Sequence, residues 1–332
     1  MKVPVDVPAR ISIAMTTYNG ERFIGDQLES FSRQTRLPDE IVVCDDCSTD
    51  STAAILEEFA RRAPFEVRVV RNRDNLGHER NFSQAVTLAR GDIIFLADQD
   101  DFWYPEKLSV IENAFANDPH ALLFINDVLI ADDSLQPIGR TVSGQLRAAG
   151  VIGKNAKGLT LGCATAIRRR LLDLVSPIPS LDYGHDSWIH DFTEVLGGRR
   201  IVEEVLQLYR RHGGNASTWT FDSPARASPI LMMKPSSGKD LTSEYQKRIQ
   251  ALQLMRERVL ALGPRRFEQV GASRNFNVVV DDLTRAIGAV ETRTNMFRCN
   301  GFSRKALAVR MLISGDYRYF LGWRSFAKDL IR

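Results

Sequence analysis

The sequence predicts an α/β protein in which a mostly parallel sheet is flanked by helices and followed by a helical C-terminal extension. Two observations carry this prediction. Between Ile11 and Ala97, short apolar strand patterns alternate with single helical patterns, which is typical of parallel sheets that are covered on both faces. From residue 241 onward the strand patterns stop, and apolar residues recur at helical spacing.

The first strand is expected at 11–15, where an apolar run ends in the turn-rich segment 16–20. Ile24, Leu28 and Phe31 then recur at helical spacing, so a helix follows. The remaining elements expected in this part are a strand at 41–44, a helix at 55–63, a strand at 67–69, a helix at 82–89 and a strand at 93–97. Polar loops follow the first, second and fourth strands, at the sheet edge where ligands bind in such folds.

The middle of the chain has a mixed pattern. Strands are expected at 122–130, 161–167, 200–202 and 206–211, a helix is expected at 186–196, and further helices are expected at 241–262 and 278–290. Residues 224–239 are rich in Pro, Ser and Gly, which is typical of a linker or loop. We therefore predict a catalytic domain over 1–220, a linker or mobile loop over 221–240 and a basic helical extension over 241–332.

The composition is that of an ordinary globular protein. Hydrophobic residues make up 44% and charged residues 26% of the 332 positions, and the length corresponds to about two domains. No apolar run approaches the roughly 18 residues that a membrane-spanning helix needs, and the first residues lack the apolar segment of a secretory signal. Four cysteines are too few for a disulfide framework. These features predict a cytoplasmic protein of enzyme size.

The net charge of +3 hides an asymmetry along the chain. Residues 293–332 contain nine Lys or Arg against two Asp, whereas the preceding residues carry a net charge of −4. Such a tail favours an anionic partner, namely a membrane surface, a nucleic acid or an acidic protein patch. Aromatic and aliphatic residues are interleaved with the basic ones, which favours peripheral attachment to the inner face of the cell membrane over nucleic acid. A helical lid on the catalytic domain, or a dimer contact, is the alternative.

Asp98-Gln99-Asp100-Asp101 directly follows the strand expected at 93–97. Three carboxylates in four residues repel one another unless a cation lies between them, and Mg²⁺ or Mn²⁺ suits such oxygen ligands. The structural alternative is a solvated turn that caps a helix beginning near Pro105. Asp45-Asp46 occupies the equivalent place after the second strand, where a carboxylate can accept hydrogen bonds from a nucleotide. Its alternative role is helix capping, with Ser48 or Thr49 as the cap.

These separate signals combine into a family resemblance. The segments 15–19, 45–50, 75–77 and 91–108 resemble, in order and spacing, the successive motifs of GT-A glycosyltransferases of family 2. The resemblance covers about residues 10–215. Asp-Gln-Asp-Asp and the Tyr-Arg-Arg-His-Gly-Gly-Asn segment that begins at Tyr209 further resemble bacterial rhamnosyltransferase-type members. One departure is Cys47, where family members often have Gly.

The resemblance implies a Rossmann-like GT-A domain with a donor half over about 1–105 and an acceptor half over about 106–220. It also implies an inverting enzyme that moves a hexose from a nucleoside diphosphate sugar to a glycan or lipid-linked acceptor in cell-surface polysaccharide synthesis. Mn²⁺ or Mg²⁺ is the implied cofactor. The implied donor-binding residues are Thr16, Tyr18, Asp46, Arg80, Asn81, Asp98, Gln99 and Arg211, and the implied metal ligands are Asp98, Asp100 and His212.

Some of these residues have plain structural alternatives. Arg80 and Asn81 lie on an expected helix, where a surface salt bridge is equally in keeping with the pattern. Arg211 and His212 follow the last expected strand and belong either to the diphosphate and metal site or to a basic surface loop.

Asp186 is the residue that the resemblance implies as general base. It stands at the start of the helix expected at 186–196, so a helix N-cap is the alternative. His185 is a competitor for the same role, and Asp191 is a weaker one. His185 and His190 are five residues apart and point in different directions on a helix, which disfavours a shared metal of the phosphohydrolase kind.

Cys44 and Cys47 have the spacing of a redox motif, but the two intervening aspartates disfavour a reactive thiolate. We expect Cys44 to pack in the sheet and Cys47 to replace a turn glycine.

Two other classes of function remain open from the sequence. A nucleotidyltransferase also uses an α/β sheet and a metal, but it usually carries a Gly-rich loop with a basic residue after the first strand. Here that place holds Thr-Thr-Tyr-Asn-Gly-Glu. A non-catalytic module that binds a nucleotide or a glycan on the same scaffold is the second alternative.

Overall fold

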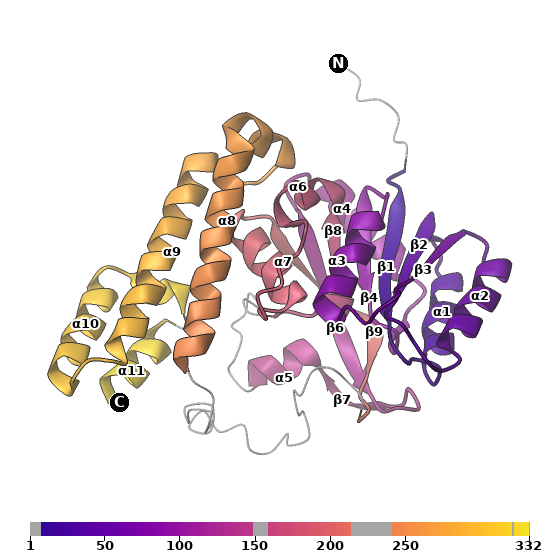
Figure 1. Cartoon of the computed structure of the whole chain (residues 1–332), viewed down its shortest axis with the longest axis horizontal. Helices are drawn as coiled ribbons and strands as arrows, with labels where there is room; N and C mark the ends of the chain where they lie inside the picture. Colours follow the sequence, from indigo (N-terminus) through magenta and orange to yellow (C-terminus); the bar gives the residue numbers. More distant parts are fainter. Residues whose placement is uncertain (1–7, 149–158, 214–240, 321, 332) are drawn as a thin grey trace. The chain divides into compact units, whose positions relative to one another are not determined.

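The computed structural model describes residues 8–148, 159–213, 241–320 and 322–331. The linker expected at 221–240 lies outside these residues. The described chain forms two compact units. The first contains the sheet and its covering helices, and the second contains the C-terminal helices together with Leu181–Gly184 (Figure 1).

Four parallel strands form the first half of the sheet, in the order β3-β2-β1-β4. These strands are β1 (Ile11–Thr17), β2 (Glu40–Asp45), β3 (Glu66–Arg71) and β4 (Ile93–Ala97). Every residue of β1, β2 and β4 is buried, because continuous apolar strands of a parallel sheet are covered on both faces. The strands expected in this part of the sequence are thereby confirmed.

Helices cover both faces of these strands. One face carries α1 (Ile24–Ser32), α2 (Thr52–Arg62) and α4 (Lys107–Asn117), whose apolar side chains share a core with alternate strand residues such as Ile13 and Val43. The other face carries α3 (His78–Leu88), which packs on β1 and β2. The alternation follows from the period of two along a strand.

The second half makes the sheet mixed rather than mostly parallel. β8 (Thr165–Arg168) lies between β4 and β6 (Leu123–Ala131) and is antiparallel to both. β9 (Arg199–Arg210) is parallel to β6, while β5 (Phe102–Trp103) is antiparallel to β9 and β7 (Pro137–Thr141) is antiparallel to β6. The smaller elements of this half are α5 (Val142–Ala148), η1 (Gly162–Ala164), η2 (Arg169–Leu171), α6 (Leu172–Val175) and α7 (His185–Val195).

Three expected strands differ in the structure. The strand expected at 161–167 begins only at Thr165, because Gly162–Ala164 form a 3₁₀ turn. The two final strands, expected at 200–202 and 206–211, are one strand, β9. Its polar residues Glu203 and Glu204 are exposed, and the register to β6 shifts at this place. A bulge therefore carries the polar pair without ending the strand.

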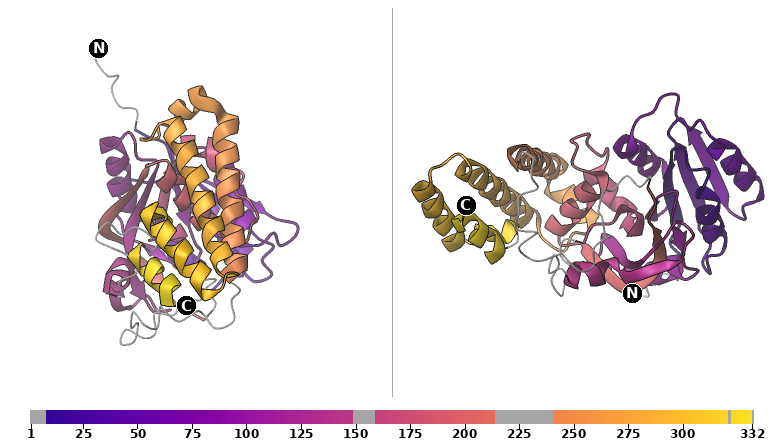
Figure 2. Two further views of the ribbon diagram at one scale, coloured as in Figure 1. Left: turned by 90° about the vertical axis from the view of Figure 1, so that its left-hand side faces the viewer. Right: turned by 90° about the horizontal axis from the view of Figure 1, so that it is seen from below.

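The C-terminal unit is helical, as the sequence predicts (Figure 2). Its helices are α8 (Leu241–Val270), α9 (Phe276–Met296), α10 (Gly301–Ile313) and α11 (Trp323–Ile331), with a 3₁₀ turn η3 (Asp316–Tyr319) between the last two. α8 is broken at Gly263, whose φ of 73° is left-handed.

A small core joins α9, α10 and η3 in this unit, and a buried ion pair lies beside it. Arg293 Nε donates to Asp329 Oδ2 over 2.9 Å, and the Tyr317 hydroxyl donates to the same oxygen over 3.0 Å. Within the described residues, no helix has the length and apolar character that crossing a membrane requires.

Candidate active site

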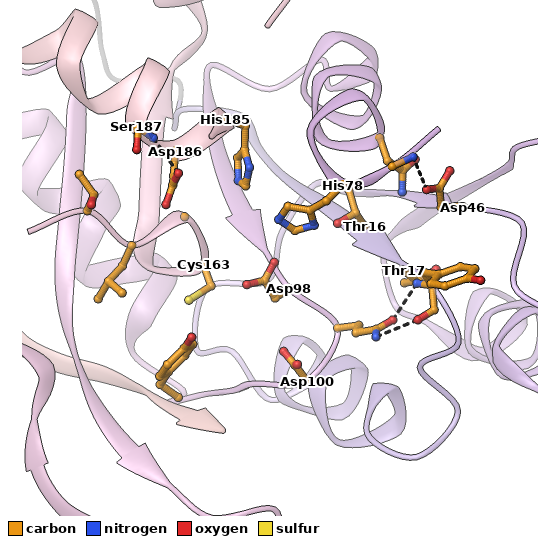
Figure 3. A pocket seen from close by; sticks show the side chains of 18 of the residues that line it. Thr16, Thr17, Asp46, His78, Asp98, Asp100, Cys163, His185, Asp186 and Ser187 are labelled. Atoms are coloured by element: carbon orange, nitrogen blue, oxygen red, sulfur yellow. Dashed lines mark hydrogen bonds between the residues drawn. The ribbon is translucent and has the colours of Figure 1, made fainter. Parts of the chain in front are cut away.

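A cavity of about 600 Å³ lies at the carboxyl ends of β1, β2 and β4. Figure 3 shows Thr16, Thr17 and Asp46 on one side, His185 and Asp186 on the other, and Asp98 and Asp100 between them. The polar loops after the first, second and fourth strands therefore meet at one edge, as the sequence predicts. The volume is within the range of small-molecule sites.

Asp46 lines the cavity directly after β2 and is held by three hydrogen bonds. Oδ1 accepts from Asn72 Nδ2 over 2.9 Å and from the Leu76 N–H over 2.8 Å, and Oδ2 accepts from the Gly77 N–H over 2.9 Å. Asn81 lies beside it and donates to the Cys44 carbonyl over 2.8 Å. The network fastens the end of β2 to the start of α3 and holds both predicted donor residues in place.

The capping role considered for the 45–50 segment is wrong for Ser48 and Thr49. α2 begins at Thr52, and Asp50 Oδ1 accepts from the Thr52 N–H over 3.0 Å. Ser48 instead accepts from the Asn19 N–H over 2.9 Å and donates to Asp45. This segment therefore joins the ends of β1 and β2.

Thr16, Tyr18 and Gln99 also line the cavity. The Tyr18 N–H donates to Gln99 Oε1 over 2.9 Å, and Gln99 Nε2 donates to the Tyr18 carbonyl over 3.1 Å. Both ends of the Gln99 amide thus hold the loop after β1 against the acidic loop. A Cβ atom at Gly20 would lie 2.3 Å from Gln99 Oε1, so this contact requires glycine.

The acidic loop Asp98–Asp101 divides its carboxylates between two environments. Asp98 and Asp100 line the cavity, whereas Asp101 is fully buried and accepts from the Arg210 N–H over 3.1 Å. Burial, with the neighbouring charges of Asp100, Asp101 and Asp186, raises the pKa of Asp98 well above its usual range. The solvated helix cap considered for this segment is wrong, because α4 begins only at Lys107 and has no side-chain cap.

His212 reaches the acidic loop from the end of β9. Its Nε2 lies 2.8 Å from Asp100 Oδ2, and its ring packs at 4.4 Å on Phe23. A loop position two residues after β9 therefore contributes an imidazole to the carboxylate cluster. The alternative of a basic surface loop is wrong for His212, whose side chain is 12% exposed.

The side chains at the acidic loop supply some of the ligands that a hard divalent cation needs. The carboxylates of Asp98 and Asp100 line the cavity, and their negative charges repel each other. Such oxygen ligands are the kind that Mg²⁺ and Mn²⁺ prefer, and the His212 imidazole is adjacent. Within the described ranges, no three His, Cys, Asp or Glu side chains are already arranged to hold an ion. The protein therefore offers Asp98, Asp100 and His212, and the phosphates of a substrate would supply further oxygens.

Asp186 lies in the first turn of α7 and points into the cavity (Figure 3). Its Oδ1 accepts from the Ser187 N–H over 2.7 Å. The helix already begins at His185, so Asp186 is not its N-cap. Because Asp186 lies on the opposite side of the cavity from Asp46, the two carboxylates can serve different substrates.

His185 also lines the cavity, but in an apolar setting. Its ring stacks on Phe82 at 4.2 Å with an interplanar angle of 9°, and burial lowers its pKa to about 4. An imidazole in this setting is neutral near pH 7. His190 points elsewhere, with Nε2 2.7 Å from the Thr165 hydroxyl, so the two histidines do not share a metal, as the sequence predicts.

Two predicted donor residues are not among those that line the cavity. Arg80 is exposed and donates to the Ser180 hydroxyl over 3.1 Å, whereas its neighbour Asn81 lines the cavity. Arg211 lies with its guanidinium 5.8 Å from the centre of the Tyr209 ring. Successive residues of a helix differ by about 100° in direction, so only one of Arg80 and Asn81 can face the site.

The cysteine predictions are confirmed. Cys44 is fully buried in β2, and burial raises its pKa to about 12. Cys47 has a φ of 65°, a left-handed conformation that favours glycine. All four cysteines are unpaired with one another, so the motif holds no disulfide.

Among the residues that line the cavity, His78 and Cys163 are missing from the sequence predictions, and Tyr209 enters them only as the first residue of a motif. His78 directly follows the Asn75–Gly77 motif, and this adjacency is the signal that could have found it. Cys163 carries no local signal, whereas Tyr209 begins the segment that resembles rhamnosyltransferase-type members. Both residues reach the cavity only because β8 and β9 are inserted beside β4 and β6.

The sequence matches the model of a known family. Residues 12–173 match the family described as Glycosyl transferase family 2. An uncharacterized glycosyltransferase of Nostoc sp. is 29% identical over 245 residues, which cover 71% of this chain and 74% of the relative. The putative glycosyltransferase EpsE of Bacillus subtilis is 30% identical over 213 residues, or 60% of this chain and 72% of EpsE. The dTDP-rhamnosyl transferase RfbG of Shigella flexneri is 38% identical over 98 residues, which cover 28% of this chain and 34% of RfbG.

A solved structure has the same fold. Residues 1–349 of TarS from S. aureus, in complex with UDP-GlcNAc, superpose with a TM-score of 0.54 at 19% identity over 97% of this chain and 88% of that one. The fold predicted from the resemblance is confirmed, with a mixed sheet flanked by helices and a helical C-terminal region.

Proposed function

Because the chain belongs to glycosyltransferase family 2, we propose that it is an inverting enzyme that moves a hexose from a nucleoside diphosphate sugar to a glycan or lipid-linked acceptor. The observation that carries this proposal is the cavity in which Asp46, the acidic loop and Asp186 meet. The proposed role is the synthesis of a cell-surface polysaccharide. The partial similarity to a dTDP-rhamnosyl transferase supports a rhamnosyltransferase-type activity.

The donor would bind along the ends of β1, β2 and β4. Thr16 lies near the end of β1, Tyr18 follows this strand, and Gln99 is on the acidic loop. Asp46 follows β2, and Asn81 is on α3. We assign these residues to the base and ribose. Asp46 already receives three hydrogen bonds, so its carboxylate is fixed before a ligand arrives. Fixing a recognition group in advance lowers the entropy that binding must offset.

Asp98, Asp100 and His212 would hold Mn²⁺ or Mg²⁺ against the donor diphosphate. When bound, such an ion neutralises the diphosphate and the charge that develops as it leaves. Asp98 supports this assignment, because burial, followed by the neighbouring charges of Asp100, Asp101 and Asp186, raises its pKa well above its usual range, and a divalent cation would favour the ionised carboxylate. Asp100 is the more direct ligand, since its oxygen already approaches the His212 imidazole.

Asp186 would act as the general base. An inverting transfer needs one group to take the proton from the acceptor hydroxyl as that hydroxyl attacks the anomeric carbon. Asp186 is on the side of the cavity opposite the donor-binding residues, at the start of α7. This separation leaves the space between them for the two reacting sugars.

Release of a nucleoside diphosphate from a donor panel tests the proposed function. Donors that raise the melting temperature in the presence of Mn²⁺ are incubated with the full chain, and the products are identified. We expect a nucleoside diphosphate, loss of turnover in EDTA and its return with Mn²⁺ or Mg²⁺. Pyrophosphate would instead indicate a nucleotidyltransferase, and binding without turnover would indicate a non-catalytic module. Full turnover in EDTA would contradict the metal assignment.

We also propose that the C-terminal unit attaches the enzyme to the inner face of the cell membrane. The aromatic and aliphatic residues that the sequence predicts at the membrane include Leu307, Tyr317, Phe320 and Phe326. That part of the prediction is wrong, because these four pack in the core of this unit. The exposed apolar residues are different ones. Phe302, Ala306, Val309 and Ile313 form one exposed stripe along α10, since they follow one another at intervals of three or four residues.

This stripe has the chemistry of a membrane contact. Phe302 is 86% and Ile313 is 82% exposed, and Lys305 and Arg310 are exposed on the same helix. Trp323, on α11, is 72% exposed. Anionic lipids would pair with the cations, and the apolar residues would insert at the boundary of headgroups and acyl chains.

Flotation with vesicles checks the membrane proposal. The full chain is expected to float at low salt with vesicles that contain phosphatidylglycerol and not with vesicles of phosphatidylcholine alone, because each basic residue near the surface adds about 1 kcal/mol. The double variant Phe302→Ser, Ile313→Ser should lose this binding. Leu260→Ser, an equally polar change at a half-exposed position of α8 outside the stripe, should keep it. Equal flotation of the double variant and the unaltered chain would contradict the proposal.

A further inference from the structure

Lys107, Gln207 and Asp101 form a buried chain of hydrogen bonds beneath the cavity. The three side chains are at most 1% exposed. Lys107 Nζ donates to Gln207 Oε1 and, over 3.2 Å, to the Cys163 carbonyl, and it lies 3.6 Å from the centre of the Trp103 ring. Gln207 Nε2 donates to Asp101 Oδ2 over 2.9 Å. Lysine and aspartate are rarely buried to this extent without a partner, and here one amide links them.

The same chain fastens the acidic loop to the end of β9. The Arg210 N–H donates to Asp101 Oδ1 over 3.1 Å, and Arg210 Nε donates to the Asp100 carbonyl over 2.8 Å. Two residues beyond Arg210, in the loop that follows β9, His212 meets the Asp100 carboxylate at 2.8 Å. The position of His212 relative to Asp100 is therefore set by how the loop is anchored at Asp101.

We propose that Lys107, Gln207 and Asp101 are positioning residues that set the spacing between Asp100 and His212 for a divalent cation. The inference rests on the proposed metal-dependent transfer and extends it to residues that do not touch the substrate. Outer residues that orient metal ligands commonly change metal affinity by about 10–100-fold when they are replaced.

The chain has a fixed polarity. An ammonium group only donates hydrogen bonds, so the Gln207 oxygen must face Lys107. The Gln207 nitrogen then faces Asp101, and a carboxylate only accepts. Each end of the chain therefore holds the amide in the orientation that the other end requires. Because all three groups are buried, water does not compensate for a mismatch.

Asp101→Asn reverses one end of this polarity with little change in shape. If the amide oxygen at position 101 keeps the Arg210 N–H, the amide nitrogen faces the Gln207 nitrogen, and turning the Gln207 amide would place its nitrogen against the Lys107 ammonium. If the oxygen at position 101 instead accepts from Gln207, the nitrogen faces the Arg210 N–H. One buried pair is lost in every case. If Lys107 is also replaced by Met, the Gln207 amide is free to turn, and the hydrogen bond to position 101 can form again. The polarity thus predicts that the second substitution offsets part of the first.

The test measures Mn²⁺ binding directly, without turnover. Mn²⁺ alone is titrated into the full chain, and the signal of free Mn²⁺ is followed by electron paramagnetic resonance. Asp101→Asn is expected to raise the dissociation constant about 10–100-fold, and Lys107→Met is expected to raise it too. The fold-increase in the dissociation constant of the double variant should be at least about threefold smaller than the product of the fold-increases of the two single variants.

Glu40→Gln is the matched control. Glu40 is a fully buried carboxylate at the start of β2, where it accepts from the Ser12 hydroxyl over 2.6 Å and from the Arg90 N–H over 2.6 Å. Its substitution should lower the melting temperature and leave Mn²⁺ affinity unchanged. Should Lys107→Met fail to fold, Asp101→Asn decides alone. Unchanged Mn²⁺ affinity in Asp101→Asn, or strict multiplication of the single effects, overturns the positioning role. Absence of Mn²⁺ binding by the unaltered chain overturns this inference, whereas the metal assignment itself is decided by the loss of turnover in EDTA and its return with Mn²⁺ or Mg²⁺.

Discussion

Replacing Asp186 by Asn is expected to lower kcat by about 10²–10⁴-fold and to leave donor affinity nearly unchanged. The substitution keeps the shape of the side chain and its contact with the Ser187 N–H, but the amide cannot accept the proton of the acceptor hydroxyl. The donor residues lie on the other side of the cavity, so their contacts stay intact. Steady-state kinetics with varied donor, together with donor titration without acceptor, separates the two effects.

Two further variants complete this test. Asp191→Asn is the matched control, because it makes the same change on the same helix at a residue that is not among those lining the cavity. His185→Ala should reduce turnover less than Asp186→Asn, since a proton on a buried ring stacked against Phe82 is unfavourable. An inactive His185→Ala beside an active Asp186→Asn would show that the base is misassigned. Near-normal activity of both variants would remove the proposed mechanism.

The second large effect is expected at Asp100. Asp100→Ala should lower kcat/KM by about 10²-fold or more, because an ion on the leaving diphosphate supplies several kcal/mol of charge stabilisation. The loss should exceed that of Asp101→Ala, since Asp101 is buried and acts only through the geometry of the loop. Activity is measured as a function of Mn²⁺ concentration, and His212→Ala is expected to shift the half-saturating concentration upward.

A surface carboxylate serves as the control for Asp100. Glu58→Gln removes an exposed partner of Arg61 on α2, and pairs of this kind contribute little to stability. Its kinetics should match those of the unaltered chain. If Asp100→Ala retained full kcat/KM and the same Mn²⁺ dependence, the acidic loop would have no metal role.

The half of the fold that contains the four parallel strands was predictable from the sequence. β1, β2 and β4 are continuous apolar runs, and parallel strands place Thr16, Asp46 and Asp98 at one edge. No side-chain contact had to be known for that inference, because the topology of a parallel sheet fixes it. Cys47 was predictable in the same way, from a position where the motif requires a left-handed residue.

The rest depended on contacts between distant segments. Nothing local indicates that Lys107 is buried, since lysine is usually exposed and its partner Gln207 lies 100 residues further on. The antiparallel strand β8 is only four residues long, so its pattern did not reveal its direction. In the tail, the interleaving of apolar and basic residues did not tell which side chains pack inward. That division follows from helical phase and from the buried Arg293–Asp329 pair.

The position of β8 also has a consequence for how this polypeptide can be made or shortened. β8 pairs with β4 along one of its edges and with β6 along the other. It therefore covers the edge of β4 that faces away from β1. A fragment that stopped near residue 105 would present the whole apolar strand Ile93–Ala97 with an open row of backbone N–H and C=O groups, and such edges recruit other chains. On the ribosome, that edge stays open until residues 165–168 have been synthesised. Truncated versions for expression or crystallisation should therefore retain the chain through the end of β9, however self-sufficient the half with the four parallel strands looks.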